Sequence, residues 1–121
     1  MIHSAQAQSS NIPYRITLTD GRGHTWYADE PVADGGADTA PNPMQLVLSA
    51  LGACTAITLQ MYAGRKQWPL KQINVNLQLN PEGKPADGNQ ITRNITLHGE
   101  LDDAQRQRLL QIANACPVHK L

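Results

Sequence analysis

The stretch PNPMQLVLSALGACTAITLQMYAGR, residues 41–65, decides the fold. It carries no charge before Arg65, and its apolar side chains recur at helical spacing on nearly every side. The unbroken apolar run, residues 46–59, is too short for a membrane span, which needs about 20 residues. We therefore predict a core helix of a soluble protein, buried on most faces, with the thiol of Cys54 at its middle.

Both ends of this helix carry suitable boundary residues. Asn42 can serve as the N-cap, and Pro43 fits the first helical position, where a backbone N–H has no intrahelical partner. Gly64 and Arg65 are expected to close the helix.

The composition favours one domain over residues 1–121 and excludes a strongly charged surface. Lys and Arg together number 10, as do Asp and Glu, so nothing attracts a nucleic acid or a membrane surface. Phe is absent, so Leu, Ile, Val and Ala must build the core. A chain this small buries a modest fraction of its surface, and dimerisation is a common way to cover more.

The cysteines and the N-terminus indicate a reducing compartment. Two cysteines far apart in the chain do not form a disulfide framework of the secreted kind. Residues 1–12 lack the basic and apolar regions of a signal peptide, and their Gln, Ser and Ala content predicts a poorly ordered tail. We therefore expect a cytoplasmic protein.

Alternating patterns predict strands on both sides of the helix. Residues 14–19 and 24–28 read as a hairpin around the turn Asp-Gly-Arg-Gly. Residues 29–43 form a loop with room for one short edge strand. After the helix come strands over residues 73–79 and 91–98, separated by a polar loop, and a second helix from residue 104 to about 115. This order, β-β-(β)-α-β-β-α, predicts an α+β two-layer domain.

Arg93 breaks the pattern of its strand. It shares a face with Ile91, Ile95 and Leu97, so it points toward the side where the buried helix must lie. A buried cation is tolerated only when it is paired or hydrogen-bonded. Arg93 therefore needs a partner in the core.

Cys54 has two interpretations. A free cysteine on an apolar helix often acts as a small hydrophobic residue. To react, its thiol must lose a proton, yet burial raises a thiol pKa and a mid-helix position offers no N-terminal dipole. The fold would then have to bring a cation to it, with Arg93 the first candidate and Arg15 and Arg22 the others.

Cys116 ends the second helix and has similar alternatives. It is either a core cysteine or a second thiol that attacks an oxidised Cys54, which requires only that the two helices meet. The helix dipole disfavours an anion there, and His119 and Lys120 partly offset this effect.

Two other chemistries use the same residues. Cys54, Cys116, His98 and His119 could hold zinc, although no paired CxxC or HxxxH spacing supports such a site. Cys54 with His119 and an acid could form a cysteine hydrolase, although a mid-helix thiol lacks an obvious oxyanion hole.

Two motifs resemble those of the OsmC/Ohr-like family. Residues 42–54, NPMQLVLSALGAC, are similar to its "NPxELLLxALGAC" helix, and residues 116–120, CPVHK, resemble the "CPVH(K/R)" motif of its small OsmC-like branch. The likeness extends from about residue 29 to residue 120.

The resemblance implies an intertwined homodimer in which β-sheets wrap two central helices. It also implies a thiol peroxidase that prefers organic hydroperoxides and acts in oxidative stress defence. By this resemblance Cys54 attacks the peroxide and Cys116 resolves the product as a disulfide. No cofactor is then needed, and an external dithiol such as a lipoyl group restores the thiols.

Gln45 stands where the family has a glutamate that helps hold the active arginine. A neutral amide can hydrogen-bond an arginine but forms no ion pair with it. Two alternatives stay open: a non-catalytic dimer that binds an apolar small molecule with inert cysteines, and a peroxide sensor.

Overall fold

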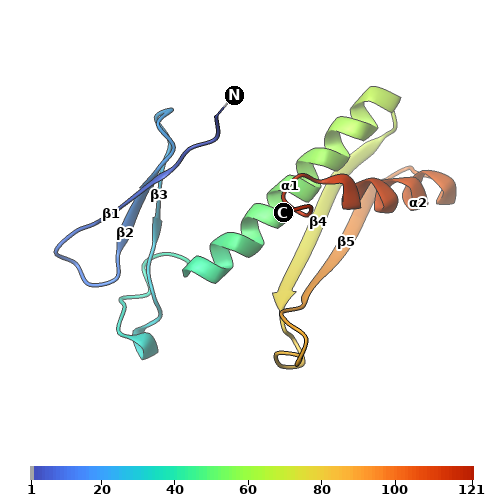
Figure 1. The fold of residues 1–121 in the computed structure, drawn as a ribbon. Helices are drawn as coiled ribbons and strands as arrows, with labels where there is room; N and C mark the ends of the chain where they lie inside the picture. Colours follow the sequence, from blue (N-terminus) through green and yellow to red (C-terminus); the bar gives the residue numbers. More distant parts are fainter. Residues whose placement is uncertain (1) are drawn as a thin grey trace. The chain divides into compact units, whose positions relative to one another are not determined.

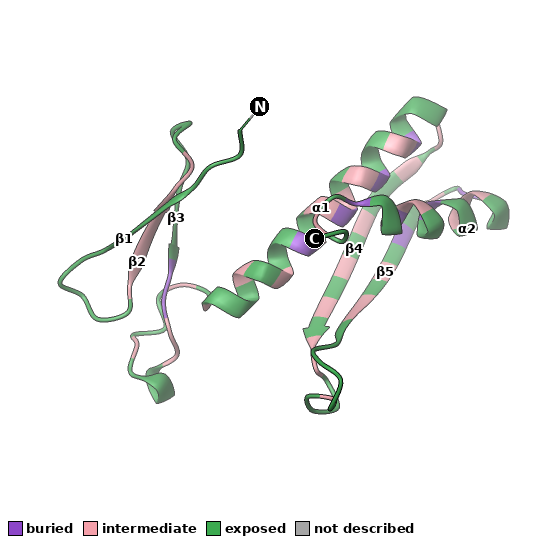
Figure 2. Ribbon diagram, in the orientation of Figure 1, coloured by how far each residue is buried: buried purple, intermediate pink, exposed green. Residues whose placement is uncertain are grey.

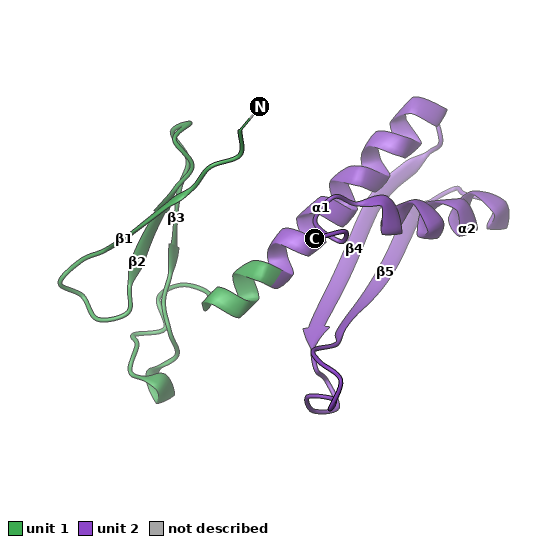
Figure 3. Cartoon of the chain, viewed as in Figure 1, with its two compact units in different colours: residues 1–47 green, residues 48–121 purple. Residues whose placement is uncertain are grey.

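The computed structural model describes residues 2–121 as two compact units, one ending at Val47 and the other formed by Leu48–Leu121 (Figure 3). Both units contain an antiparallel sheet, and a long helix begins in the first unit and continues through the second. The architecture is α+β with antiparallel sheets and one long helix, as predicted. The single domain expected over residues 1–121 stays a prediction.

The first unit holds an antiparallel sheet in the order β1-β2-β3 (Figure 1). Its strands are β1 (Gln6–Ser9), β2 (Ile16–Thr19) and β3 (Thr25–Ala28). The predicted hairpin turn joins β2 to β3, and Gly21 and Gly23 adopt positive φ values of 77° and 92° there. Glycine takes this conformation without steric cost, so the turn chemistry explains the hairpin.

The expected poorly ordered tail over residues 1–12 is wrong for Gln6–Ser9. These residues form β1 and pair antiparallel with Ile16–Thr19. All four are exposed, so backbone hydrogen bonds and not an apolar face hold the strand, which is why periodicity did not reveal it. Met1 lies outside the described residues. The loop after β3 contains a short 3-10 turn, η1 (Val32–Asp34), in place of an edge strand.

The long helix α1 (Pro43–Lys66) begins as predicted. The Gln45 backbone N–H donates to Asn42 Oδ1 at 2.8 Å, and the Asn42 backbone N–H donates to Gln45 Oε1 at 3.0 Å. This reciprocal pair is a capping box, which satisfies two backbone donors at the helix start.

The end of α1 lies slightly beyond the predicted Gly64–Arg65. Gln67 takes a positive φ of 57° and donates its backbone N–H to the Gly64 carbonyl. The Trp68 N–H donates to the Ala63 carbonyl at 2.9 Å. This is a Schellman ending with glutamine where glycine is usual.

The rest of the second unit packs a hairpin and a short helix on one side of α1. It comprises β4 (Leu70–Leu79), β5 (Ile91–Gly99), α2 (Asp103–Ile112) and the 3-10 turn η2 (Ala113–Ala115). The two strands pair antiparallel, with Leu77 opposite Arg93. Gly99 has φ 141°, and a Cβ there would collide with the Pro69 carbonyl oxygen, so only glycine suits this position.

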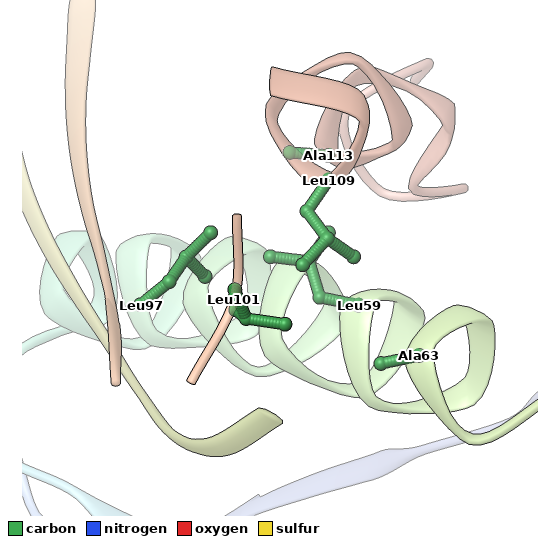
Figure 4. Close-up of a cluster of buried hydrophobic side chains, with 6 residues drawn as sticks. All are labelled: Leu59, Ala63, Leu97, Leu101, Leu109 and Ala113. Carbon is green, nitrogen blue, oxygen red and sulfur yellow. The ribbon is translucent and has the colours of Figure 1, made fainter. Parts of the chain in front are cut away.

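One apolar cluster forms the core of the second unit (Figure 4). It draws side chains from α1, from β5 and the residues after it, and from α2 with η2: Leu59, Ala63, Leu97, Leu101, Leu109 and Ala113. Burying each leucine contributes about 1.5–3 kcal/mol. The cluster fixes how α2 and the chain that follows it lie against α1.

Within one chain, α1 is buried on one stripe and not on most faces (Figure 2). Its buried residues recur at every fourth position: Leu51, Thr55, Leu59 and Ala63. Val47, Ile57 and Met61 are 53%, 50% and 63% exposed. The expected all-round burial is therefore wrong for the single chain, because the hairpin and α2 cover only one side of the helix.

Candidate thiol site

Two thiols from distant parts of the sequence meet in the second unit. Cys54 lies in the middle of α1, and Cys116 follows η2 directly. Both are free, and their side chains lie close enough to influence each other's pKa. The packing of α2 against α1 therefore brings together the two cysteines that the sequence analysis singled out.

The two sulfurs differ in exposure. Cys116 is 0% exposed, whereas Cys54 is half-buried. In the single chain a solute can therefore approach Cys54, while Cys116 is shielded from it. Because of this difference in exposure, Cys54 can react with a molecule from solution, whereas Cys116 can react only with a neighbouring group of the protein.

Backbone and hydroxyl donors surround the pair. The turn after Cys116 aims the His119 backbone N–H at Cys116 Sγ, at 3.4 Å. The Val118 backbone N–H acts to lower the pKa of both thiols, the Thr58 side chain that of Cys54 and the Thr55 side chain that of Cys116. Converging N–H groups of this kind stabilise an anion.

The surroundings move the two thiol pKa values in opposite directions. Burial raises the pKa of Cys54 above its ordinary value, and its hydrogen bond to Cys116 raises it further, against the donors Val118 and Thr58. Burial also acts to raise the pKa of Cys116, but its interactions with Cys54, His119, Val118 and Thr55 hold that pKa below its ordinary value.

Arg93 reaches the neighbourhood of the thiols through Thr55. One guanidinium nitrogen donates to Thr55 Oγ1 at 2.8 Å and to the Ala113 carbonyl at 3.2 Å, and the other donates to Asn114 Oδ1 at 2.8 Å. The predicted need for partners on the core side is therefore met. The expected direct pairing with Cys54 is replaced by a link through a hydroxyl.

The other predicted residues have different surroundings. Arg15 donates to Thr39 and stacks over Tyr27, 4.4 Å from the ring centroid, and Arg22 is exposed near the hairpin turn. Gln45 belongs to the capping box of α1. His119 has an exposed side chain and contributes its backbone N–H.

The described part of the chain does not bring the four proposed zinc ligands together. His98 is exposed and hydrogen-bonds to Asn74 across the hairpin. Over residues 2–121 the structure gathers no group of three or more His, Cys, Asp or Glu side chains able to hold a metal ion.

Thr55 is a site residue that the sequence analysis missed. It is 0% exposed, and its hydroxyl donates to the Leu51 carbonyl at 2.8 Å while accepting from Arg93. The available signal was a polar residue on the same helical stripe as Leu51 and Leu59, because buried polar side chains need partners. No sequence pattern could predict that the Val118 backbone N–H lies near the thiols, because every non-proline residue has a backbone N–H.

The chain matches one protein family and its solved structures. Residues 35–121 match the family described as OsmC-like protein. The OsmC-like protein of Mycoplasma pneumoniae has a TM-score of 0.81 and 17% identity, covering 99% of this chain and 86% of that one. No protein with a curated description matches.

Two further structures share the fold. An organic hydroperoxide resistance protein, OsmC, from Legionella pneumophila has a TM-score of 0.71 and 18% identity, covering 99% of this chain and 88% of that one. The organic hydroperoxide resistance protein OhrB of Bacillus subtilis has a TM-score of 0.65 and 21% identity, covering 99% and 89%. At these identities the likeness establishes the fold.

Proposed function

This chain belongs to the OsmC-like protein family, and we propose that it is a thiol-dependent peroxidase that reduces organic hydroperoxides through Cys54 and Cys116. The observation that carries the proposal is that two free thiols, Cys54 on α1 and Cys116 after η2, lie close enough to influence each other's pKa. A sulfenic acid formed on one would meet the other at once and condense to a disulfide. Relatives described as organic hydroperoxide resistance proteins support the choice of substrate class.

Exposure divides the two roles. Cys54 is half-buried and can meet a peroxide, so its thiolate attacks the O–O bond and becomes the sulfenic acid. Cys116 is 0% exposed and meets only Cys54, so it resolves the sulfenic acid by forming the disulfide.

Restoring the reduced state requires an electron source outside this chain. A dithiol such as a lipoyl group would exchange with the Cys54–Cys116 disulfide and release both thiols. A reducing compartment, the cytoplasm, supplies such dithiols, and the whole cycle would serve oxidative stress defence.

We propose also that the protein works as a homodimer. The exposed stripe of α1 has steps of three, seven and four residues, as in helices that pair along a seam: Val47, Ala50, Ile57 and Met61. By length and composition alone, α1 is long and apolar enough to cross a membrane. A second copy would cover this apolar stripe.

The dimer is tested by placing a charge on the stripe. Ile57→Asp is expected to convert a dimer to a monomer in light scattering, because a carboxylate in an apolar interface is costly. Leu110→Asp on α2 is the matched control, since Leu110 is 47% exposed against 50% for Ile57. A wild type that is already monomeric would contradict the proposal.

The peroxidase is tested by following the loss of cumene hydroperoxide and, separately, hydrogen peroxide with a dithiol present. The wild type is expected to prefer the organic peroxide, and Cys54→Ser to react no faster than buffer. Cys116→Ser should still form one sulfenic acid per chain but should lose turnover through the disulfide. If wild type and Cys54→Ser are equally inactive, the non-catalytic dimer that binds an apolar molecule becomes the better account.

A further inference from the structure

Resting on the proposed peroxidase function, we propose that Arg93 is a positioning residue: its guanidinium ties the turn that leads to Cys116 to the part of α1 that carries Cys54, and so holds the two sulfurs in place for disulfide formation. This role differs from the one expected from the sequence, in which Arg93 was the first candidate for a cation beside Cys54. It depends on the three groups that accept hydrogen bonds from Arg93.

Arg93 joins three elements of the second unit through one guanidinium. It lies on β5, and one terminal nitrogen donates to Thr55 Oγ1 of α1 at 2.8 Å and to the Ala113 carbonyl of η2 at 3.2 Å. The other terminal nitrogen donates to Asn114 Oδ1, also in η2, at 2.8 Å. Thr55 directly follows Cys54, and η2 leads directly to the other cysteine. The guanidinium therefore links the two chain segments that carry the thiols.

The hairpin of β4 and β5 packs on the turn of α1 that contains Cys54. Leu77 on β4 pairs with Arg93 on β5, so their side chains lie on one face of the hairpin. A Cβ on Gly52 would lie 2.9 Å from Leu77 Cδ1, so β4 approaches α1 closely there. Gly52 and Thr55 are three residues apart and lie on one face of the helix. Both strands thus contact this turn of α1, and Arg93 reaches from it to η2.

The turn η2 is short and depends on partners outside itself. It is a 3-10 turn of three residues, and within the described residues no side chain caps its start. Such turns have poorer hydrogen-bond geometry than an α-helix. Arg93 donates to the Ala113 carbonyl at the end of α2 and η2, where carbonyl groups lack intrahelical partners and a positive charge is favourable. Arg93 thus holds the turn from which Cys116 extends.

An apolar side chain would suit the position of Arg93 in its strand. The face of β5 on which Arg93 lies is otherwise apolar: Ile91, Ile95 and Leu97. The three acceptors of Arg93 are a hydroxyl, a carbonyl and an amide oxygen, all of them neutral. Placing a half-buried charge among neutral acceptors costs more than placing an apolar side chain there. An exception of this kind to the apolar pattern is expected at a functional position.

Disulfide formation is the step that needs the two segments aligned. Once Cys54 is a sulfenic acid, the Cys116 sulfur attacks the Cys54 sulfur, the S–S bond forms and the S–O bond breaks. The hydroxide that leaves takes the Cys116 thiol proton and becomes water, so no oxidant is needed beyond the hydroperoxide already consumed. A disulfide accepts a narrow range of geometry, with Cα atoms about 4.4–6.8 Å apart. By limiting the motion of η2 relative to α1, Arg93 increases the time that Cys116 spends in position to attack.

A thiol–disulfide equilibrium measures this alignment without any peroxide. The reduced protein is equilibrated with known ratios of reduced to oxidised glutathione, and the fraction of Cys54–Cys116 disulfide is read by mass spectrometry after alkylation. Oxidised glutathione takes two electrons and two protons from the thiol pair and gives two glutathione thiols. Arg93→Met continues the apolar face of β5 and should fold, as circular dichroism checks. It should lower the effective concentration of the thiol pair roughly 10-fold, since small misplacements of reacting groups have effects of this size or larger.

Arg106→Met is the matched control. Arg106 is another half-buried arginine with three hydrogen bonds, and its acceptors belong neither to α1 nor to η2: the carbonyls of Leu97, Gly99 and Leu101. Its replacement should lower the free energy of unfolding and leave the effective concentration of the thiol pair unchanged. An equal fall in Arg93→Met and Arg106→Met would overturn the proposal, because it would show a general loss of packing.

Asn114 provides a test of the contact by rescue. Asn114→Ala removes one acceptor and should lower the effective concentration less than Arg93→Met does, because Thr55 and Ala113 still accept from the guanidinium. Asn114→Asp keeps an acceptor oxygen and adds a negative charge beside the guanidinium, so it should restore at least the wild-type value. Asn114→Asp behaving no better than Asn114→Ala would overturn the proposal.

Single-turnover kinetics separate positioning from activation of Cys54. After mixing with cumene hydroperoxide, the sulfenic acid is trapped with a cyclic diketone, and disulfide formation is timed in parallel without the trap. Arg93→Met should form the sulfenic acid at the wild-type rate and the disulfide roughly 10-fold more slowly. Slower formation of the sulfenic acid with unchanged formation of the disulfide would overturn the proposal and make Arg93 the cation that activates Cys54.

The two experiments also separate this proposal from the function on which it rests. A wild type that is inert to peroxide, but whose glutathione equilibrium depends on Arg93, would overturn the peroxidase and support the positioning role. A wild type that reduces peroxide, while Arg93→Met keeps the wild-type equilibrium and rate of disulfide formation, would overturn the positioning role and leave the peroxidase intact.

Discussion

The two units of the chain are stabilised by different kinds of interaction. Residues 48–121 bury a cluster of apolar side chains contributed by two helices and a strand. In the described residues up to Val47, the buried side chains are Ala28 and the carboxylate Asp29. The second unit therefore depends on apolar burial, which is insensitive to pH, whereas the first depends on a charged, hydrogen-bonded loop.

Asp29 organises the loop of the first unit. It accepts from the Thr39 hydroxyl at 2.6 Å, the Thr39 backbone N–H at 3.0 Å and the Glu30 N–H at 2.7 Å. These donors hold its pKa at about 2, well below the ordinary 3.8. Gly36 completes the loop, since a Cβ there would collide with the Glu30 carbonyl oxygen. The comparison thus predicts different responses to core truncation and to acid.

The largest stability effect is expected from Leu109→Ala. Leu109 is 0% exposed at the centre of the second unit's cluster, so truncation leaves a cavity and costs about 2–5 kcal/mol in the free energy of unfolding. Leu18→Ala in β2 is the matched control, because Leu18 is half-buried and should cost less, about 1 kcal/mol. Chemical denaturation measures both values, and equal losses would remove the contrast between the units.

A smaller loss is expected from Arg106→Ala in the second unit. Its guanidinium donates to the carbonyls of Leu97 at 2.7 Å, Gly99 at 2.9 Å and Leu101 at 3.3 Å, and so ties the end of β5 to α2. Leaving these acceptors without a donor should cost about 1–3 kcal/mol.

Arg106→Lys serves as the control for charge. Lysine keeps the cation but cannot direct donors to three carbonyls in one plane, so it should recover only part of the loss. Full recovery, measured by denaturation, would mean that charge and not geometry matters at this position.

The smallest effect near neutral pH is expected from Asp29→Asn in the first unit, and its signature is pH dependence. Because the folded pKa of Asp29 lies below the unfolded value, its stabilisation is present above about pH 4 and is lost as the pH falls toward 2. The stability of the variant should not show this pH dependence, although the amide oxygen can still accept some of the hydrogen bonds that Asp29 accepts.

Amide hydrogen exchange against pH resolves this effect by unit. Protection factors, which correct for the pH dependence of intrinsic exchange, should fall in β3 and its loop on acidification of the wild type and should change less in α2. A variant that shows the wild-type acid response would place the titrating group elsewhere.

Much of the local structure was predictable from the sequence. The N-cap Asn42, the hairpin glycines and the alternation in β4 each depend on a few neighbouring residues, and each forms where expected. The exposed strand β1 was missed because its ladder uses backbone groups that every residue has. The helix α1 ends later than predicted because Gln67, which follows its last residue, adopts the left-handed conformation that glycine usually adopts at a helix end.

The sequence indicated the two thiols of the candidate site, but it did not indicate which residues contact the groups around them. The apolar helix and the end of the second helix marked Cys54 and Cys116 as the sulfurs to compare. The break in the pattern of β5 correctly indicated that Arg93 needs partners on the core side. Its connection through Thr55 could not be read from spacing, because 38 residues separate the two.

The sequence by itself determined the long helix, the strands with an apolar face and the two cysteines, because periodicity and capping act between residues close in the chain. Only the tertiary structure decided that Cys116 is the buried thiol and Cys54 the accessible one, and that α1 leaves an apolar stripe uncovered. Those outcomes depend on which elements pack against one another and at what angle. Packing is set jointly by side chains from α1, β5 and α2, and no single stretch of sequence contains it.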